Sequence, residues 1–107
     1  MTTFNDRERA EEAKFARDEE THFRIVARRN RLLGEWAAAR MSLSAAETEA
    51  YAKSVVQADF EEAGDEDVIR KVLGDLIGAG CEASDAEVRA ALDAKLVEAR
   101  RALIGEA

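Results

Sequence analysis

The chain has 107 residues with no proline and six glycines, and its formal net charge is −7. This length suits one domain, and so few turn residues argue against a β-sandwich or a β-barrel. No apolar run approaches the roughly 18 residues of a membrane span, the first residues lack the apolar stretch of a secretory signal, and the acidic balance argues against nonspecific binding to nucleic acid.

The N-terminal part of the chain differs from the rest. Residues 1–31 carry eight Lys/Arg and seven Asp/Glu, a net charge of +1, whereas the remaining residues carry −8. The first 22 residues contain no Val, Ile or Leu, and Phe4 and Phe15 are their large apolar side chains apart from Met1. Two buried phenylalanines, at about 1.5–3 kcal/mol each, cannot offset about 1–2 kcal/mol of backbone entropy per ordered residue. We therefore expect residues 1–19 to be disordered or nascent-helical in isolation.

From about Glu19, apolar residues recur at helical spacing and predict a first helix that runs to about Met41. The start of this helix is poorly defined by the sequence, because the charged residues before it also favour a helix. We expect Trp36 to lie in the core. The apolar stripe comprises Phe23, Ile25, Val26, Ala27, Leu32, Leu33, Trp36 and Ala37.

Three further helices follow, separated by recognisable start and stop signals. The sequence Ser44-Ala45-Ala46-Glu47 fits a capping box that opens a second helix, which Gly64 would end. Asp65 is expected to cap a third helix, which ends at Gly78-Ala79-Gly80, and Ser84-Asp85-Ala86-Glu87 fits a second capping box that opens the last helix.

Each of these helices has an apolar stripe. The stripes comprise Tyr51, Val55, Val56, Ala58 and Phe60 on the second helix, Val68, Ile69, Val72, Leu73, Leu76 and Ile77 on the third, and Val88, Leu92, Leu96, Ala99 and Leu103 on the last. Short links favour antiparallel neighbours. The sequence thus predicts an all-α fold, a small four-helix bundle over residues 20–107 with a mobile N-terminal segment over residues 1–19.

Residue chemistry does not indicate an enzyme. The Glu19-x-x-His22 step is one half of a di-iron signature, but His22 is the only histidine, which leaves open only a site shared across a dimer. No histidine follows Cys81 to act as its base, and a lone cysteine suits the reducing cytoplasm. The acidic run over residues 59–67 lacks the ligand spacing of a calcium loop. We expect no catalytic residue, no metal and no cofactor.

Binding is the remaining class of function, and the N-terminal segment is best suited to it. Phe4 and Phe15 lie eleven residues apart, close to three helical turns, so both would share one helix face. A segment of this kind can fold into a partner's groove with its aromatic residues as anchors. The alternative is that the segment is only a frayed extension of the first helix.

Several blocks of sequence are distinctive. They are the run from Phe4 to Ala16 (FNDRERAEEAKFA), the run from Ala27 to Gly34 (ARRNRLLG), Trp36-Ala37-Ala38, Tyr51-Ala52-Lys53, Ala58-Asp59-Phe60-Glu61-Glu62 and Gly64-Asp65-Glu66-Asp67-Val68. In this order, over roughly residues 3–77, they resemble the zeta subunit of alphaproteobacterial F-type ATP synthases.

This resemblance implies a small four-helix bundle whose N-terminal segment resembles, in role, the mitochondrial inhibitor protein. Such a segment enters the catalytic interface between the alpha and beta subunits, near the gamma stalk, and blocks rotation in the hydrolytic direction. The implied partners are the alpha, beta and gamma subunits of the catalytic head. The implied location is cytoplasmic, peripheral to the inner membrane through the ATP synthase.

Carried over to this chain, the resemblance makes residues 1–19 the inhibitory segment. We assign roles within it by residue type, with the phenylalanines as apolar anchors, the basic residues facing carboxylates and the acidic residues facing basic groups. The assigned residues are Phe4, Asp6, Arg7, Glu8, Arg9, Glu11, Glu12, Lys14 and Phe15. The competing interpretation is a generic helical adaptor or oligomerisation module that does not inhibit an ATPase.

Overall fold

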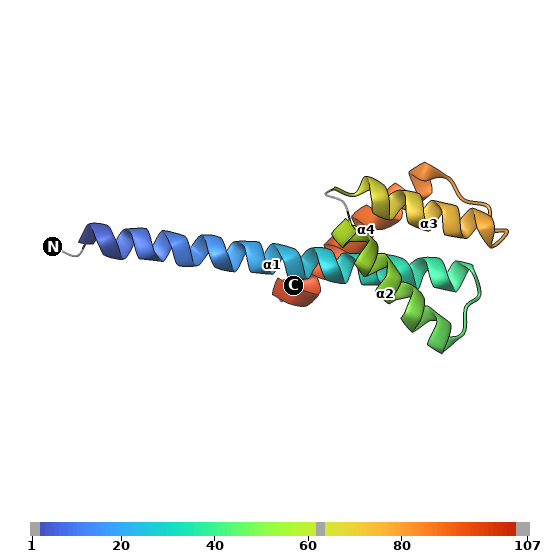
Figure 1. The fold of residues 1–107 in the computed structure, drawn as a ribbon, viewed down its shortest axis with the longest axis horizontal. Coiled ribbons are helices and arrows are strands. Elements are labelled where there is room, and N and C mark those ends of the chain that lie inside the picture. The colour runs from blue at the N-terminus through green and yellow to red at the C-terminus, as the bar shows by residue number, and fades with distance from the viewer. Residues whose placement is uncertain (1–2, 62–63, 105–107) are drawn as a thin grey trace.

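The computed structural model describes residues 3–61 and 64–104, with the backbone alone for residues 3–18, 60, 61 and 104. Within these ranges the chain forms four helices and no strand (Figure 1). They are α1 (Thr3–Arg40), α2 (Ala45–Glu61), α3 (Glu66–Gly78) and α4 (Asp85–Ile104). The predicted all-α fold with four helices is confirmed.

Helix α1 is longer than the sequence pattern suggested. It runs from Thr3 to Arg40 over 38 residues, whereas the apolar stripe predicts a start near Glu19. The reason is that the preceding charged residues are themselves good helix formers, so the backbone stays helical where the stripe is absent. The division into residues 1–19 and 20–107 therefore coincides with no break in the helix, and the disorder of the first segment stays a prediction.

The first predicted capping box forms in full and the second in part. The backbone N–H of Ser44 donates to Oε1 of Glu47 at 2.8 Å, and the backbone N–H of Glu47 donates to Oγ of Ser44 at 3.2 Å. The bond from the Ser44 backbone N–H lowers the pKa of the Glu47 carboxyl. At the start of α4, the backbone N–H of Glu87 donates to Oγ of Ser84 at 3.2 Å. Local sequence alone thus determines where α2 and α4 begin.

The link between α2 and α3 differs from the expectation. Helix α2 is described as far as Glu61, and Gly64, which was expected to end it, has a φ of +101°, a left-handed conformation that suits glycine. Asp65 does occupy the N-cap position of α3, but its side chain makes no capping bond there. The prediction of an Asp65 side-chain cap is wrong, because the carboxylate instead accepts a hydrogen bond from Arg29 of α1 at 2.9 Å.

The core forms where the four apolar stripes meet. Trp36 and Leu73 are partly buried and pack against it, Leu96 is half-buried, and the side chain of Phe60 lies outside the described residues. The buried members of the cluster are Leu33, Ala37, Val55, Val68, Ile69, Val72, Leu76, Val88 and Leu92.

Three residues of the predicted stripes are exposed instead. Phe23 is 54% exposed, Ile77 57% and Leu103 42%. Phe23 precedes the buried part of α1, Ile77 is in the last turn of α3, and Leu103 is in the last turn of α4. Because α1 and α4 are longer than α3, the ends of their apolar stripes, at Phe23 and Leu103, lie past the core.

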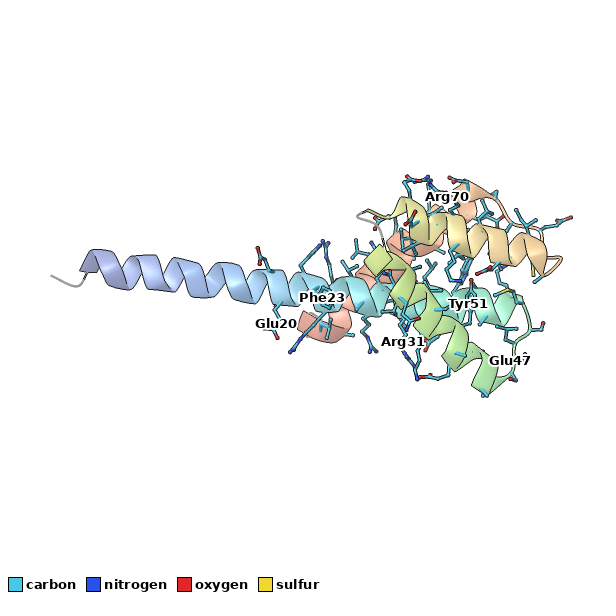
Figure 2. All side chains as sticks on the ribbon, in the orientation of Figure 1. Glu20, Phe23, Arg31, Glu47, Tyr51 and Arg70 are labelled. Atoms are coloured by element: carbon cyan, nitrogen blue, oxygen red, sulfur yellow. The ribbon has the colours of Figure 1, made fainter. Side chains whose placement is uncertain are left out.

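A polar contact made by Tyr51, which is labelled in Figure 2, joins α2 to α3. The Tyr51 hydroxyl donates to Oδ2 of Asp75 at 2.9 Å, and the same oxygen accepts from Nζ of Lys71 at 3.1 Å. Burial and the neighbouring Asp75 carboxylate raise the pKa of Tyr51 far above its usual range. The phenol therefore stays protonated and remains a donor to Asp75 at ordinary pH.

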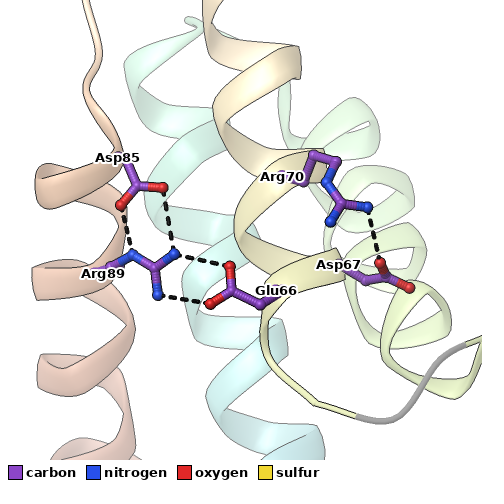
Figure 3. Close-up of polar contacts among 5 residues, drawn as sticks. All are labelled: Glu66, Asp67, Arg70, Asp85 and Arg89. Carbon is purple, nitrogen blue, oxygen red and sulfur yellow. Dashed lines mark hydrogen bonds and ion pairs between the residues drawn. The ribbon is translucent and has the colours of Figure 1, made fainter.

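An ionic network joins α3 to α4 on the surface (Figure 3). Arg89 donates to both carboxylate oxygens of Glu66, at 3.0 and 2.8 Å, and also to Asp85. This contact lowers the pKa of Glu66. The groups are exposed, so the network contributes little stability on its own. The bidentate pair between Arg89 and Glu66 nevertheless favours one register of α4 against α3.

Gly34 sets how closely α1 approaches α2. A Cβ atom at this position would lie 2.7 Å from Cα of Ala52 and 3.2 Å from Cγ2 of Val55. Real side chains do not make contacts as short as the first, and the atom in the way belongs to the backbone. The two helices cross closely because position 34 has no side chain.

Replacing Gly34 by alanine is expected to lower the free energy of unfolding by about 1–3 kcal/mol, because overpacking outweighs the gain in helix propensity. Gly74 of α3 is the matched control, since a Cβ there meets nothing within 4 Å. Gly74→Ala is expected to raise stability by up to about 1 kcal/mol. Urea unfolding measures both changes, and an equal gain from both substitutions would contradict the close approach at Gly34.

Candidate partner-binding site

The N-terminal part of α1 projects away from the other helices (Figure 1). A helix of 38 residues is about 57 Å long, which accounts for most of the longest dimension of the molecule, 66 Å against 29 and 25 Å. Among the side chains that the structure describes, Ile25 is the first buried one. The bundle therefore presents a helical extension that precedes its core.

All nine sequence-predicted site residues lie in this extension. Their backbone belongs to the first part of α1, from Phe4 to Phe15. Their side chains lie outside the described part of the structure, so the contact roles assigned to them stay predictions. What the structure adds is that positions 4 and 15 belong to one unbroken helix, as the shared-face hypothesis requires.

The base of the extension is a charged, exposed surface. Glu19, Glu20 and His22 are exposed, and Glu20 pairs with Arg24 one turn later at 2.8 Å. Exposed pairs of this kind contribute only tenths of a kcal/mol. Among the residues with described side chains, no group of three His, Cys, Asp or Glu is placed to hold a metal ion.

A buried polar cluster lies where the extension meets the bundle. The Arg29 guanidinium donates twice to Oδ1 of Asn30, at 3.0 and 2.9 Å, and once to Asp65 at 2.9 Å. Arg29 is 5% exposed and Asn30 is fully buried. The cluster ties α1 to the link before α3. Sequence reasoning missed it, because Arg29 and Asn30 stand in a charged run that gives no sign of burial.

A groove lies between α1 and α2 beside this cluster. We call it the α1–α2 groove; it is partly open, with about 190 Å³ of empty space that includes solvent. Its apolar walls come from both helices, and Asp59 of α2 adds a carboxylate. Its lining residues are Phe23, Val26, Ala27, Asn30, Val56 and Asp59. Nothing in the sequence pattern pointed to this groove, because helical periodicity treats Phe23 and Val26 as core.

Comparison with known proteins decides the family. A family model described as ATPase inhibitor subunit zeta matches residues 1–102. The chain belongs to the ATPase inhibitor subunit zeta family. The match includes the extension as well as the bundle, so the family pattern spans both parts of α1.

The fold of this zeta-family chain is also similar to that of a solved structure. A protein described as "Solution NMR structure of the protein" is 49% identical, with a TM-score of 0.69, and the match covers 79% of this chain and 96% of that chain. No match was found among curated proteins. The solved structure supports the bundle architecture described above.

Membership in the zeta family supports an inhibitory, regulatory role and implies an ATP synthase as the partner. An inhibitor-subunit family implies a non-catalytic, regulatory protein. In the described residues, no helix is both long enough and apolar enough to cross a membrane.

Proposed function

We propose that this chain inhibits ATP hydrolysis by the F-type ATP synthase through its N-terminal segment, residues 1–19. The segment inserts at the interface of the alpha, beta and gamma subunits in the catalytic head. The bundle remains outside this interface and anchors the segment. The observation that carries the proposal is the projection of the N-terminal part of α1 from the bundle in a chain of the zeta family (Figure 1).

The physical argument begins with what the segment lacks. A helix without tertiary contacts is marginal in water, because most helical stability in proteins comes from packing of an apolar face. The first 22 residues contain no Val, Ile or Leu, so they have little apolar surface to pack against the bundle. The segment is therefore available to a partner, which supplies the packing that the chain itself does not.

Charge supports a specific docking. Residues 1–18 carry four basic and five acidic side chains, and both signs alternate along the helix. Such a pattern matches a partner surface of mixed charge, and it sets register and orientation more than affinity. The affinity then comes mainly from the apolar anchors Phe4 and Phe15.

A block by insertion has a direction. A helix wedged between rotating and stationary subunits resists the sense of rotation that drives it deeper, and the opposite sense expels it. The proposal therefore includes stronger inhibition of hydrolysis than of synthesis.

Deleting residues 1–19 is expected to abolish inhibition of ATP hydrolysis and to leave the bundle folded, because the described core begins at Ile25. The measurement is titration of the full and shortened chains into the catalytic head from the same organism, with hydrolysis and synthesis followed separately. Helical content and melting temperature of the shortened chain provide the folding control. Equal inhibition by both chains would place the inhibitory surface on the bundle and contradict the proposal.

The double substitution Phe4→Ala and Phe15→Ala is expected to weaken inhibition by about one to two decades per aromatic, because each anchor contributes about 1.5–3 kcal/mol. Ile77→Ala is the matched control, since it removes an exposed apolar side chain from the far end of α3. Half-maximal inhibitory concentrations provide the measurement. An effect of the double substitution no larger than that of Ile77→Ala would contradict the anchor roles.

A further inference from the structure

The α1–α2 groove contains a buried hydrogen-bond donor without a partner. Nδ2 of Asn30 is buried and makes no hydrogen bond to the described residues. Its orientation is fixed, because Oδ1 of the same amide accepts two bonds from Arg29, and turning the amide over would place two donors face to face. A buried donor without an acceptor costs free energy, so the groove favours a ligand that brings an acceptor.

A second polar group lies in the same groove. Asp59 is half-buried and makes no ion pair with the described residues. The other lining residues are apolar: Val26, Ala27, Val56 and Phe23, which is 54% exposed. The groove therefore offers one carboxylate and an apolar lining, with the unpaired N–H donor of Asn30 buried beneath them.

The position of the groove relates it to the extension. Positions 4, 15 and 26 of α1 are spaced by eleven residues, which brings each to within about 20° of the previous one around a continuous helix. Val26 of the groove thus lies on the helix face that carries the two proposed anchors. A partner that follows this face from Phe4 toward the bundle reaches the groove.

We propose that the α1–α2 groove is a second contact with the catalytic head, and that it holds a Lys- or Arg-bearing segment of that partner. The proposal rests on the proposed function for the identity of the partner. The aliphatic stem of the basic residue packs on Val26, Ala27 and Val56, and its charged end pairs with Asp59. Nδ2 of Asn30 has no exposed surface, so the side chains that line the groove must shift before a backbone carbonyl of the same segment accepts its hydrogen bond.

This chemistry favours a long basic residue over other occupants. Lys and Arg have apolar stems and charged ends, so one side chain can pack against the apolar lining of the groove and also form an ion pair with Asp59. An entirely apolar segment would leave Asp59 buried without a counter-ion, which is costly. An acidic segment would meet Asp59 with like charge. The groove therefore selects by charge as well as by shape.

The test uses the full chain and direct binding to the immobilised catalytic head of the same organism. The groove variants are Phe23→Ser and Asp59→Lys. Their matched controls are Ile77→Ser, which alters a side chain of similar exposure (57% against 54% for Phe23), and Asp93→Lys, which makes the same charge change on the exposed surface of α4. All four substitutions avoid the buried residues, and thermal melting verifies that each variant is folded.

Each groove variant is expected to weaken binding about tenfold, more than most interface residues do when they are truncated, and each control less than about twofold. Groove variants that bind as well as their controls would overturn the proposal. So would concentration-dependent self-association of the wild type that both groove variants abolish, since the occupant would then be a second copy.

The binding assay and the inhibition assay together distinguish this proposal from the proposed function. Weakened binding by the groove variants, with no inhibition of hydrolysis by the wild type, supports the groove contact and contradicts the inhibitory role. Strong inhibition that depends on Phe4 and Phe15, with groove variants equal to controls, contradicts the groove contact alone.

Discussion

The rest of the structure depends on α1, a single helix that is packed in the bundle at its C-terminal half and projects from the bundle at its N-terminal half (Figure 1). The C-terminal half of α1 is the central element of the bundle, where Gly34 lets α2 approach until a Cβ would clash with Ala52. The N-terminal half continues the same helix beyond the core (Figure 1). Because both halves share one backbone, the bundle fixes the point from which the extension starts.

The polar cluster at Arg29 lies where these two environments meet. Its guanidinium bonds to Asn30 within α1 and to Asp65 before α3, so the link between α2 and α3 is held against the helix at the point where the extension begins. Burying an arginine is costly unless its donors are satisfied. The position of Asn30 in the α1–α2 groove then follows from the position of Arg29, since the two side chains bond to each other.

The parts of the fold that depend on nearby residues could be predicted from the sequence. The first capping box forms in full and the second in part, because Ser44 and Ser84 are each followed three residues later by a glutamate. The apolar stripe of α3 is buried except at Leu73, which is partly buried, and at Ile77. The parts that depend on distant residues could not be predicted. The Asp65 carboxylate bonds to Arg29 of α1 and makes no capping bond to α3. The exposure of Phe23 follows from the relative lengths of the helices. To predict the α1–α2 groove, one would have to know that α1 packs against α2, and no local sequence pattern gives that information.

Amide hydrogen exchange of the full chain, alone and bound to the catalytic head, tests the central claim most directly. The account predicts fast exchange over residues 3–18 in the free protein, since a helix without tertiary packing opens readily, and strong protection of the same amides in the complex. The bundle amides from Leu33 onward are expected to be protected in both states and provide the internal reference. Stable protection of residues 3–18 in the free protein, or no gain in protection on binding, would contradict the claim that this segment is the inhibitory element.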